Sequence, residues 1–144
     1  MKIGKLLFVL IGLFLIIVIA VYLLILNIKR DNLKINTYNE QYEYYLNKNI
    51  TGLDLATLIN KTINLNEKNS IEKDENNHYI ENKDNSIKIE IKLSATKKTY
   101  SMEEFYNNDT SEFVKYFAEE NFKCVEIKYH KETGKVSMLI FEQL

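Results

Sequence analysis

The sequence predicts an α+β protein: an N-terminal transmembrane helix with a helical stem, then a small domain of antiparallel strands packed against two to four helices. Three observations predict this class. The chain opens with a long apolar run, a later segment repeats apolar residues at helical spacing, and the C-terminal half alternates apolar and polar residues. The 144 residues therefore divide into a short tail at 1–5, a transmembrane helix at 6–28, a stem at 29–49 and one domain at 50–144.

The apolar run from Leu6 to Leu26 contains no charged, amide or carboxylate side chain. At a rise of about 1.5 Å per residue, such a run reaches the roughly 30 Å thickness of a bilayer's hydrocarbon core. The alternative is a secretory signal, because Val18 and Ala20 suit the positions just before a cleavage site. A cut there would leave the apolar residues Val21–Leu26 as a new N-terminus, so we expect an uncleaved anchor that contacts the bilayer through residues 6–28.

The orientation of the anchor follows weakly from its flanking charges. Lys2 and Lys5 precede it, and Lys29, Arg30 and Lys34 follow it, so the positive-inside rule barely discriminates. Long domains translocate largely regardless of charge. We therefore expect a single-pass protein of the cell membrane, with a cytoplasmic N-terminus and the C-terminal domain outside.

The stem carries an apolar stripe, because Ile35, Tyr38, Tyr42 and Tyr45 fall on one helical face. One interpretation is a short coiled coil that binds a protein partner or a second copy of the chain. The run holds fewer than three clean heptads, however. We therefore favour the other interpretation, in which the tyrosines pack onto the protein's own domain with their hydroxyl groups at its edge.

The first half of the domain is predicted to hold one helix and two short strands. Thr51 and Asp54 have the spacing of a capping box, and apolar residues at helical spacing then predict a helix from about Leu53 to Asn66. Polar turn residues follow, with short strands expected around Ile71 and around Tyr79–Ile80.

The second half is predicted to hold a strand, two short helices and a hairpin. Strict alternation predicts a strand over 87–93 in an antiparallel sheet covered on one side. A second capping box, Ser101 with Glu104, precedes a helix expected over Asp109–Glu120. Two apolar runs joined by a loop with Gly134 then predict a C-terminal β-hairpin.

Composition and charge disfavour several classes of function. The chain has 19 Lys and Arg against 20 Asp and Glu, a net charge of -1, and these residues alternate instead of forming a basic patch, so nucleic-acid binding is not expected. The lone Cys124 excludes a disulfide within one chain. Pro and Trp are absent and Asn is abundant, which is typical of an AT-rich genome and makes asparagine motifs weak evidence.

Few residues could carry chemistry. In the predicted hairpin, Cys124 and His130 share a face but stand about 20 Å apart along the strand, so we expect Cys124 to be a small core residue. His78 and His130 lack a second ligand at metal-binding spacing and are expected to be exposed. Glu103 and Glu104 are interpreted as first-turn acids that serve the helix cap. No catalytic, cofactor-binding or metal-binding residue is predicted, and no cofactor is expected.

The function that these observations favour is protein binding by a small extracytoplasmic domain, as an accessory or assembly subunit of a bacterial cell envelope. Two alternatives stay open. One is a membrane-tethered hydrolase whose site is assembled from scattered residues. The other is a secreted soluble domain released after Ala20.

Overall fold

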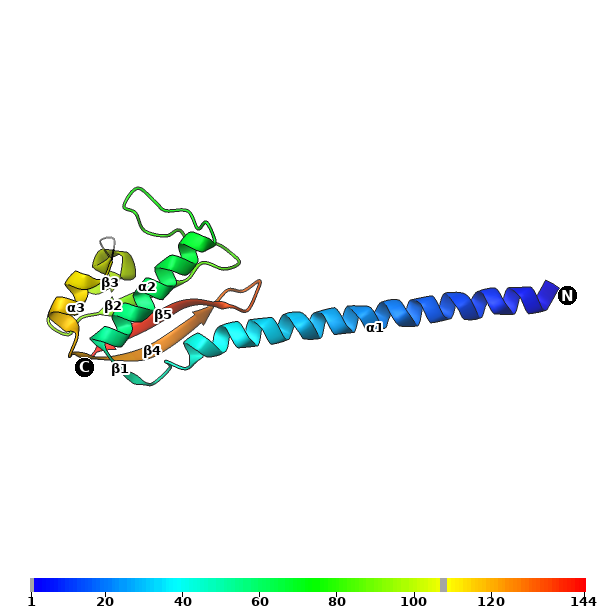
Figure 1. Ribbon diagram of the computed structural model, residues 1–144, viewed down its shortest axis with the longest axis horizontal. Helices are drawn as coiled ribbons and strands as arrows, with labels where there is room; N and C mark the ends of the chain where they lie inside the picture. The colour runs from blue at the N-terminus through cyan, green and yellow to red at the C-terminus, as the bar shows by residue number, and fades with distance from the viewer. Residues whose placement is uncertain (1, 107–108) are drawn as a thin grey trace. The chain divides into compact units, whose positions relative to one another are not determined.

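The computed structural model describes residues 2–106 and 109–144. They form two compact units, one up to Asn36 and one from Thr37 to Leu144. The class is α+β, as predicted (Figure 1). In chain order the elements are α1 (Lys2–Glu43), β1 (Asn49–Thr51), α2 (Gly52–Lys68), β2 (Lys88–Lys92), β3 (Thr99–Ser101), the short 3-10 helix η1 (Met102–Phe105), α3 (Ser111–Phe117), β4 (Asn121–Tyr129) and β5 (Val136–Gln143).

The first unit is helix α1 up to Asn36, and it contains the apolar run from Leu6 to Leu26. Every large apolar side chain from Leu7 to Leu26 is exposed, with 78% of Phe8 accessible. By length and composition this helix is able to cross a membrane. A helix that is apolar all round and covered by nothing differs from the core helix of a soluble protein, which buries one stripe against its neighbours.

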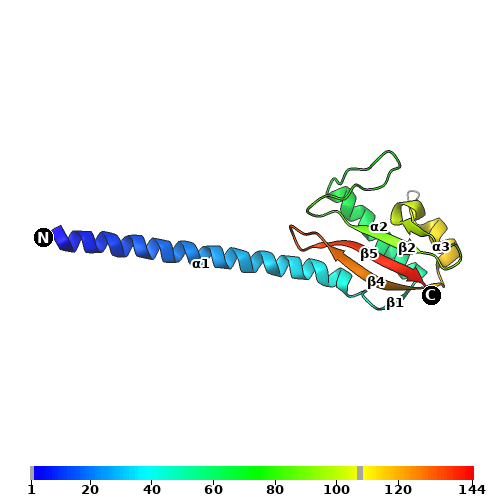
Figure 2. The same cartoon turned by 180° about the vertical axis from the view of Figure 1, so that it is seen from behind.

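The second unit is built on a five-stranded sheet in the order β1-β4-β5-β2-β3 (Figures 1 and 2). The C-terminal hairpin is confirmed: β4 and β5 are antiparallel, and Gly134 in their loop has a φ of 68°. The expectation of a purely antiparallel sheet is wrong, because β2 and β5 pair in parallel, with Ile89 opposite Leu139. Alternation along a strand predicts which side chains face the core, but it does not predict the direction of the neighbouring strand.

The strand over 87–93 is confirmed as β2, with its predicted faces. Ile89 and Ile91 are buried, whereas Lys88 and Glu90 are half-buried and Lys92 is exposed on the opposite face. The short strands expected around Ile71 and Tyr79–Ile80 are not formed. An isolated bridge between Lys73 and Tyr79 stands in their place, because polar turn residues leave too little chain for a ladder.

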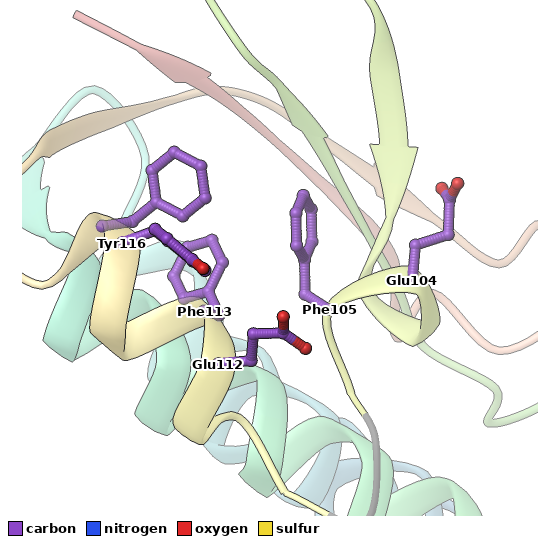
Figure 3. A pocket seen from close by; sticks show the side chains of 6 residues that line it. Glu104, Phe105, Glu112, Phe113 and Tyr116 are labelled. Atoms are coloured by element: carbon purple, nitrogen blue, oxygen red, sulfur yellow. The ribbon is translucent and has the colours of Figure 1, made fainter.

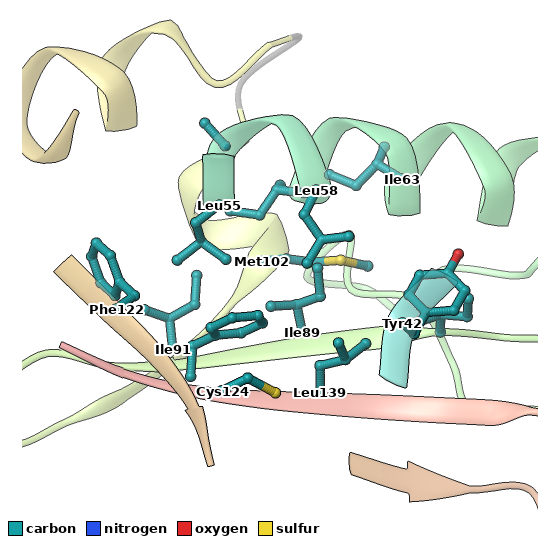
Figure 4. Close-up of a cluster of buried hydrophobic side chains, with 14 of the residues drawn as sticks. Tyr42, Leu55, Leu58, Ile63, Ile89, Ile91, Met102, Phe122, Cys124 and Leu139 are labelled. Atoms are coloured by element: carbon teal, nitrogen blue, oxygen red, sulfur yellow. The ribbon is translucent and has the colours of Figure 1, made fainter. Parts of the chain in front are cut away.

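The core lies between one face of the sheet and the helices (Figure 4). Helix α2 lies over this face, and its buried residues include Leu55, Leu58 and Ile63, which lie above Ile89, Ile91 and Leu139 of the strands. The fully buried large side chains include Tyr42, Leu55, Leu58, Ile59, Ile63, Tyr79, Ile87, Ile89, Ile91, Met102, Phe122 and Phe141. The domain is therefore a two-layer structure with one covered sheet face, as the alternation in β2 predicted.

Helix α2 begins where the sequence predicted and is held by two polar devices. The Thr51 hydroxyl accepts a hydrogen bond from the Asp54 amide at 3.2 Å, and the Asp54 carboxylate accepts one from the Thr51 amide at 3.3 Å, which completes the capping box. Near the other end, the buried Asn66 amide group pairs with both backbone groups of Ile87, at 2.7 and 3.0 Å. The Asn66 side chain therefore makes the two hydrogen bonds that a neighbouring strand would otherwise make with Ile87, just before β2.

The stem tyrosines pack onto the domain itself, but the hydroxyl groups of Tyr38 and Tyr42 are buried and do not lie at its edge as expected. Tyr42 has no exposed surface, and Tyr38 and Tyr45 pack against the core as half-buried residues. Asn39, also in α1, donates to the Gly134 carbonyl at 2.8 Å and accepts from the Val136 amide at 2.9 Å. The last turns of α1, from Thr37 to Glu43, are thus part of the folded unit.

The segment before β4 differs from its prediction in length. The capping acid Glu104 is confirmed, since its carboxylate accepts a hydrogen bond from the Ser101 amide at 2.6 Å and opens η1. The helix expected over Asp109–Glu120 is shorter and spans Ser111–Phe117 as α3. The Gly52 and Leu53 amides donate to carbonyl groups of Glu120 and Ala118, which draws this end of the chain towards α2.

Candidate functional site

A pocket of about 300 Å³ lies between η1 and α3, and we call it the aromatic pocket (Figure 3). It is lined by Glu104, Phe105, Glu112, Phe113, Tyr116 and Phe117. Figure 3 shows Phe105 of η1 facing Phe113 and Tyr116 of α3, with the Glu112 carboxylate pointing towards Phe105. Four of the six lining residues are aromatic and two are acidic.

The aromatic rings of this pocket are packed against one another and against the core. Phe113 is buried, and its ring centroid lies 5.0 Å from those of Phe105 and Phe117. Behind them, the Phe122 ring of β4 lies 5.9 Å from Phe113. Edge-to-face and tilted pairs at these distances are favourable, by about 0.5–1.5 kcal/mol each beyond burial. The pocket wall is therefore held in place by the fold before any ligand arrives.

The two acids of the pocket are held differently. One Glu104 oxygen is bonded to the Ser101 amide, as part of the cap of η1. Glu112 is an exposed first-turn acid of α3 and takes part in none of the ion pairs found in the described part of the chain. Its carboxylate can therefore meet a ligand without first leaving a partner.

A second hollow, of about 390 Å³, surrounds Tyr79. Its polar groups bond to one another: the Tyr79 amide donates to Glu103 at 3.0 Å, the Tyr79 hydroxyl to Glu67 at 3.4 Å, and Lys73 lies 3.9 Å from Glu67. Burial, followed by the adjacent Glu67 carboxylate, raises the pKa of the Tyr79 hydroxyl far above its ordinary value. This hydroxyl stays protonated at neutral pH, so it is not a general base, and its bonds tie the 73–79 loop to α2.

Glu103 and Glu104 have different hydrogen-bond partners, contrary to our expectation. We expected Glu103 and Glu104 to serve the helix cap together, and only Glu104 does so. Glu103 accepts a hydrogen bond from the Tyr79 amide instead, 24 residues away in the chain. Adjacent residues of a helical turn point in different directions, so the two acids reach different parts of the fold.

Cys124 is a core residue, as predicted. It has no exposed surface, and burial raises the pKa of its thiol to about 11. A thiol that is protonated and inaccessible at neutral pH is a poor nucleophile. Register shifts between Cys124 and Glu126 and between Lys128 and Tyr129 also interrupt the strict alternation from which we inferred that Cys124 and His130 share a face.

Both histidines are less exposed than predicted. His130 is only 5% exposed, and its Nε2 lies 2.8 Å from the Ser86 carbonyl, so the expectation that it is exposed is wrong. His78 is half-buried, and its backbone amide donates to the Asp74 carboxylate at 2.9 Å. This bond and the one from the Asn76 amide lower the pKa of Asp74. Within residues 2–106 and 109–144, no group of three His, Cys, Asp or Glu side chains is arranged to hold a metal ion.

The residues of the aromatic pocket were not predicted as a site. Phe113 and Phe117 were recognised by their helical spacing, which is the usual signature of core residues. The available signal was the pairing of acids with aromatic residues in two neighbouring short helices, Glu104 with Phe105 and Glu112 with Phe113. The sequence alone could not tell that η1 and α3 face one another.

The chain matches no known protein family, and neither a characterised protein nor a solved structure is significantly similar to it.

Proposed function

We propose that this chain is a single-pass membrane protein whose domain, Thr37–Leu144, lies outside the cytoplasm and binds a protein partner at the cell envelope. The observation that carries the proposal is helix α1, whose apolar side chains from Leu7 to Leu26 are all exposed. Leaving them in water is costly, at about 25 cal/mol per Å² of apolar surface. A bilayer removes this cost, so the helix serves as an anchor.

The end of α1 supports retention of the anchor over cleavage. Cleavage after Ala20 would leave Val21–Leu26 exposed at the N-terminus of a helix that ends at Glu43, one residue after the buried Tyr42. Six apolar residues attached to a folded domain would promote aggregation in a secreted protein. An uncleaved helix leaves no such end.

Binding, in preference to catalysis, is supported by the burial and hydrogen bonding of the side chains that could act as nucleophiles or bases. The Cys124 thiol is inaccessible, the Tyr79 hydroxyl is bonded to Glu67, and His130 is bonded to the Ser86 carbonyl. The aromatic pocket, in contrast, offers preformed apolar surface with an accessible acid. Preformed pockets with a few polar groups are the usual form of binding sites.

Anchoring and orientation are tested with the full chain in its membrane. Carbonate extraction should leave the protein in the membrane pellet, and its intact mass should not correspond to a chain that begins at Val21. For orientation, Glu75→Cys in the exposed 74–77 loop of a Cys124→Ala chain should react with a membrane-impermeant maleimide on intact cells. The matched Lys5→Cys chain should react only after lysis. Labelling in the reverse order would refute the proposed orientation.

Binding is tested by purification of the full-length protein from detergent. A partner that co-purifies in a stable ratio supports the proposal. A monomer that carries no partner under conditions that keep the domain folded contradicts it.

A further inference from the structure

We propose that the aromatic pocket binds the cationic side chain, lysine or arginine, of a partner protein. This inference rests on the proposed function, because it names the chemistry that the binding domain would recognise. It is carried by three observations: a wall of aromatic rings, two acids at that wall, and a volume suited to one side chain.

The wall suits a cation because aromatic faces carry partial negative charge. A cation within about 6 Å of a ring centroid is attracted to that face, and the attraction increases where water is excluded. Phe105, Phe113 and Phe117 form one continuous wall, with centroids 5.0 to 6.3 Å apart. Packing on Phe122 fixes this wall, so a ligand does not have to order it on binding.

The charge of the lining selects the sign of the ligand. Among the described residues that line the pocket, Glu104, Glu112 and the Tyr116 hydroxyl are the ionisable groups, and none of these residues is a lysine, arginine or histidine. A carboxylate or phosphate would be repelled, and a neutral apolar ligand would strip water from the carboxylates without replacing it. A cation meets both the rings and the acids.

A basic group already stands next to this pocket. The Lys115 ammonium lies 5.3 Å from the centroid of the Tyr116 ring, on the exposed side of α3. Its side chain is not among those that line the pocket, so the space between η1 and α3 is not filled by it.

The size and shape of the pocket favour a side chain of a protein. A volume of about 300 Å³ is at the lower end for small-molecule sites and is too small for a large cofactor. Lysine and arginine present an apolar stem below the charged group, and this stem matches the phenylalanine wall while the head group reaches Glu112. A small quaternary ammonium ion shares the charge but lacks the stem.

The test uses the full-length protein in detergent micelles and NMR of its aromatic side chains. The probes are the capped peptides Gly-Lys-Gly and Gly-Arg-Gly, with Gly-Gln-Gly as the neutral peptide and tetramethylammonium as the small cation. We expect a basic peptide to give saturable shifts at Phe105 and Tyr116, and Gly-Gln-Gly to give none. Glu112→Gln should weaken binding about threefold to fivefold, as expected for an exposed ion pair. The matched variant Glu119→Gln, an exposed acid outside the pocket, should bind as the native protein does.

A second variant distinguishes the contribution of the aromatic ring to binding from that of apolar contact alone. Phe105→Leu keeps apolar surface but removes a ring, so it should also weaken binding of the basic peptides. Protection of the buried Cys124 thiol from a thiol reagent verifies that each variant is folded.

Four results would overturn the inference. These are equal shifts by Gly-Gln-Gly, equal affinity of the Glu112→Gln and Glu119→Gln proteins, no saturable shift with either basic peptide, or tetramethylammonium binding as tightly as the peptides. Failure here is distinct from failure of the proposed function. A partner that co-purifies equally with the Glu112→Gln chain would refute the pocket and keep the binding role, whereas extraction by carbonate would refute only the anchor.

Discussion

Substitution of Asn66 by alanine should destabilise the domain strongly, although Asn66 does not line the aromatic pocket. Its amide group is fully buried and supplies both hydrogen bonds of Ile87, at 2.7 and 3.0 Å. Each buried backbone group left unpaired costs about 1–3 kcal/mol, so the two together cost about 2–6 kcal/mol. Alanine is the better helix former by up to about 0.7 kcal/mol, which leaves a net loss of about 1–5 kcal/mol.

Cys124 provides the assay. It is the only cysteine of the chain and is buried, so its reactivity with a thiol reagent in a urea series reports unfolding of the domain alone, even with α1 in a micelle. With a slope of about 2 kcal/mol per molar urea, Asn66→Ala should lower the midpoint by about 0.5–2.5 M. Asn69→Ala is the matched control, because it loses a single half-buried bond of 3.4 Å to the Asn85 carbonyl. Equal midpoints for the two variants would refute the reasoning.

Three further predictions concern the same domain. Gly52→Ala should destabilise it severely, because a Cβ would meet the Phe117 carbonyl oxygen at 1.8 Å, whereas Gly12→Ala, with open space around it, should leave the urea midpoint unchanged. Thr51→Ala should cost about 1 kcal/mol by loss of the helix cap, and Thr51→Ser should restore most of it in the same urea series. Burial raises the pKa of the Cys124 thiol from about 9 in the unfolded chain to about 11 in the folded domain, so the protonated thiol's contribution to stability is present below pH 9 and is lost as the pH rises to 11. Stability should therefore fall by up to about 1.4 kcal/mol per pH unit across this window, and near-UV circular dichroism should show a smaller fall for Cys124→Ala.

Local patterns predicted the local structure well. The alternation in β2 predicted which of its residues are buried, and Thr51 with Asp54 predicted the start of α2. These signals operate over a few residues, where backbone geometry alone decides which side chains share a face.

Long-range pairing could not be predicted in the same way. The parallel contact of β2 with β5 joins segments about 50 residues apart, and nothing in either strand specifies it. The buried asparagines are the clearest case of residues whose roles were not predicted. Its abundance made each Asn uninformative in the sequence, yet Asn39 pairs with Gly134 and Val136, and Asn66 pairs with Ile87, at separations of 21 to 97 residues. Whether an asparagine side chain is exposed or forms buried hydrogen bonds depends on partners that are far away in the sequence and close only in the fold.

The position of β5 has a consequence for how the domain is made. The strand Val136–Gln143 lies between β4 and β2, yet it is synthesised after every other strand of the sheet. Until it emerges from the ribosome, β4 pairs only with β1 and β2 only with β3, and the two halves have no shared ladder. In the proposed orientation, the domain therefore stays incompletely folded while most of it crosses the membrane, which suits transfer as an extended chain. The unpaired edges of β2 and β4 during this interval are where association with other chains would begin.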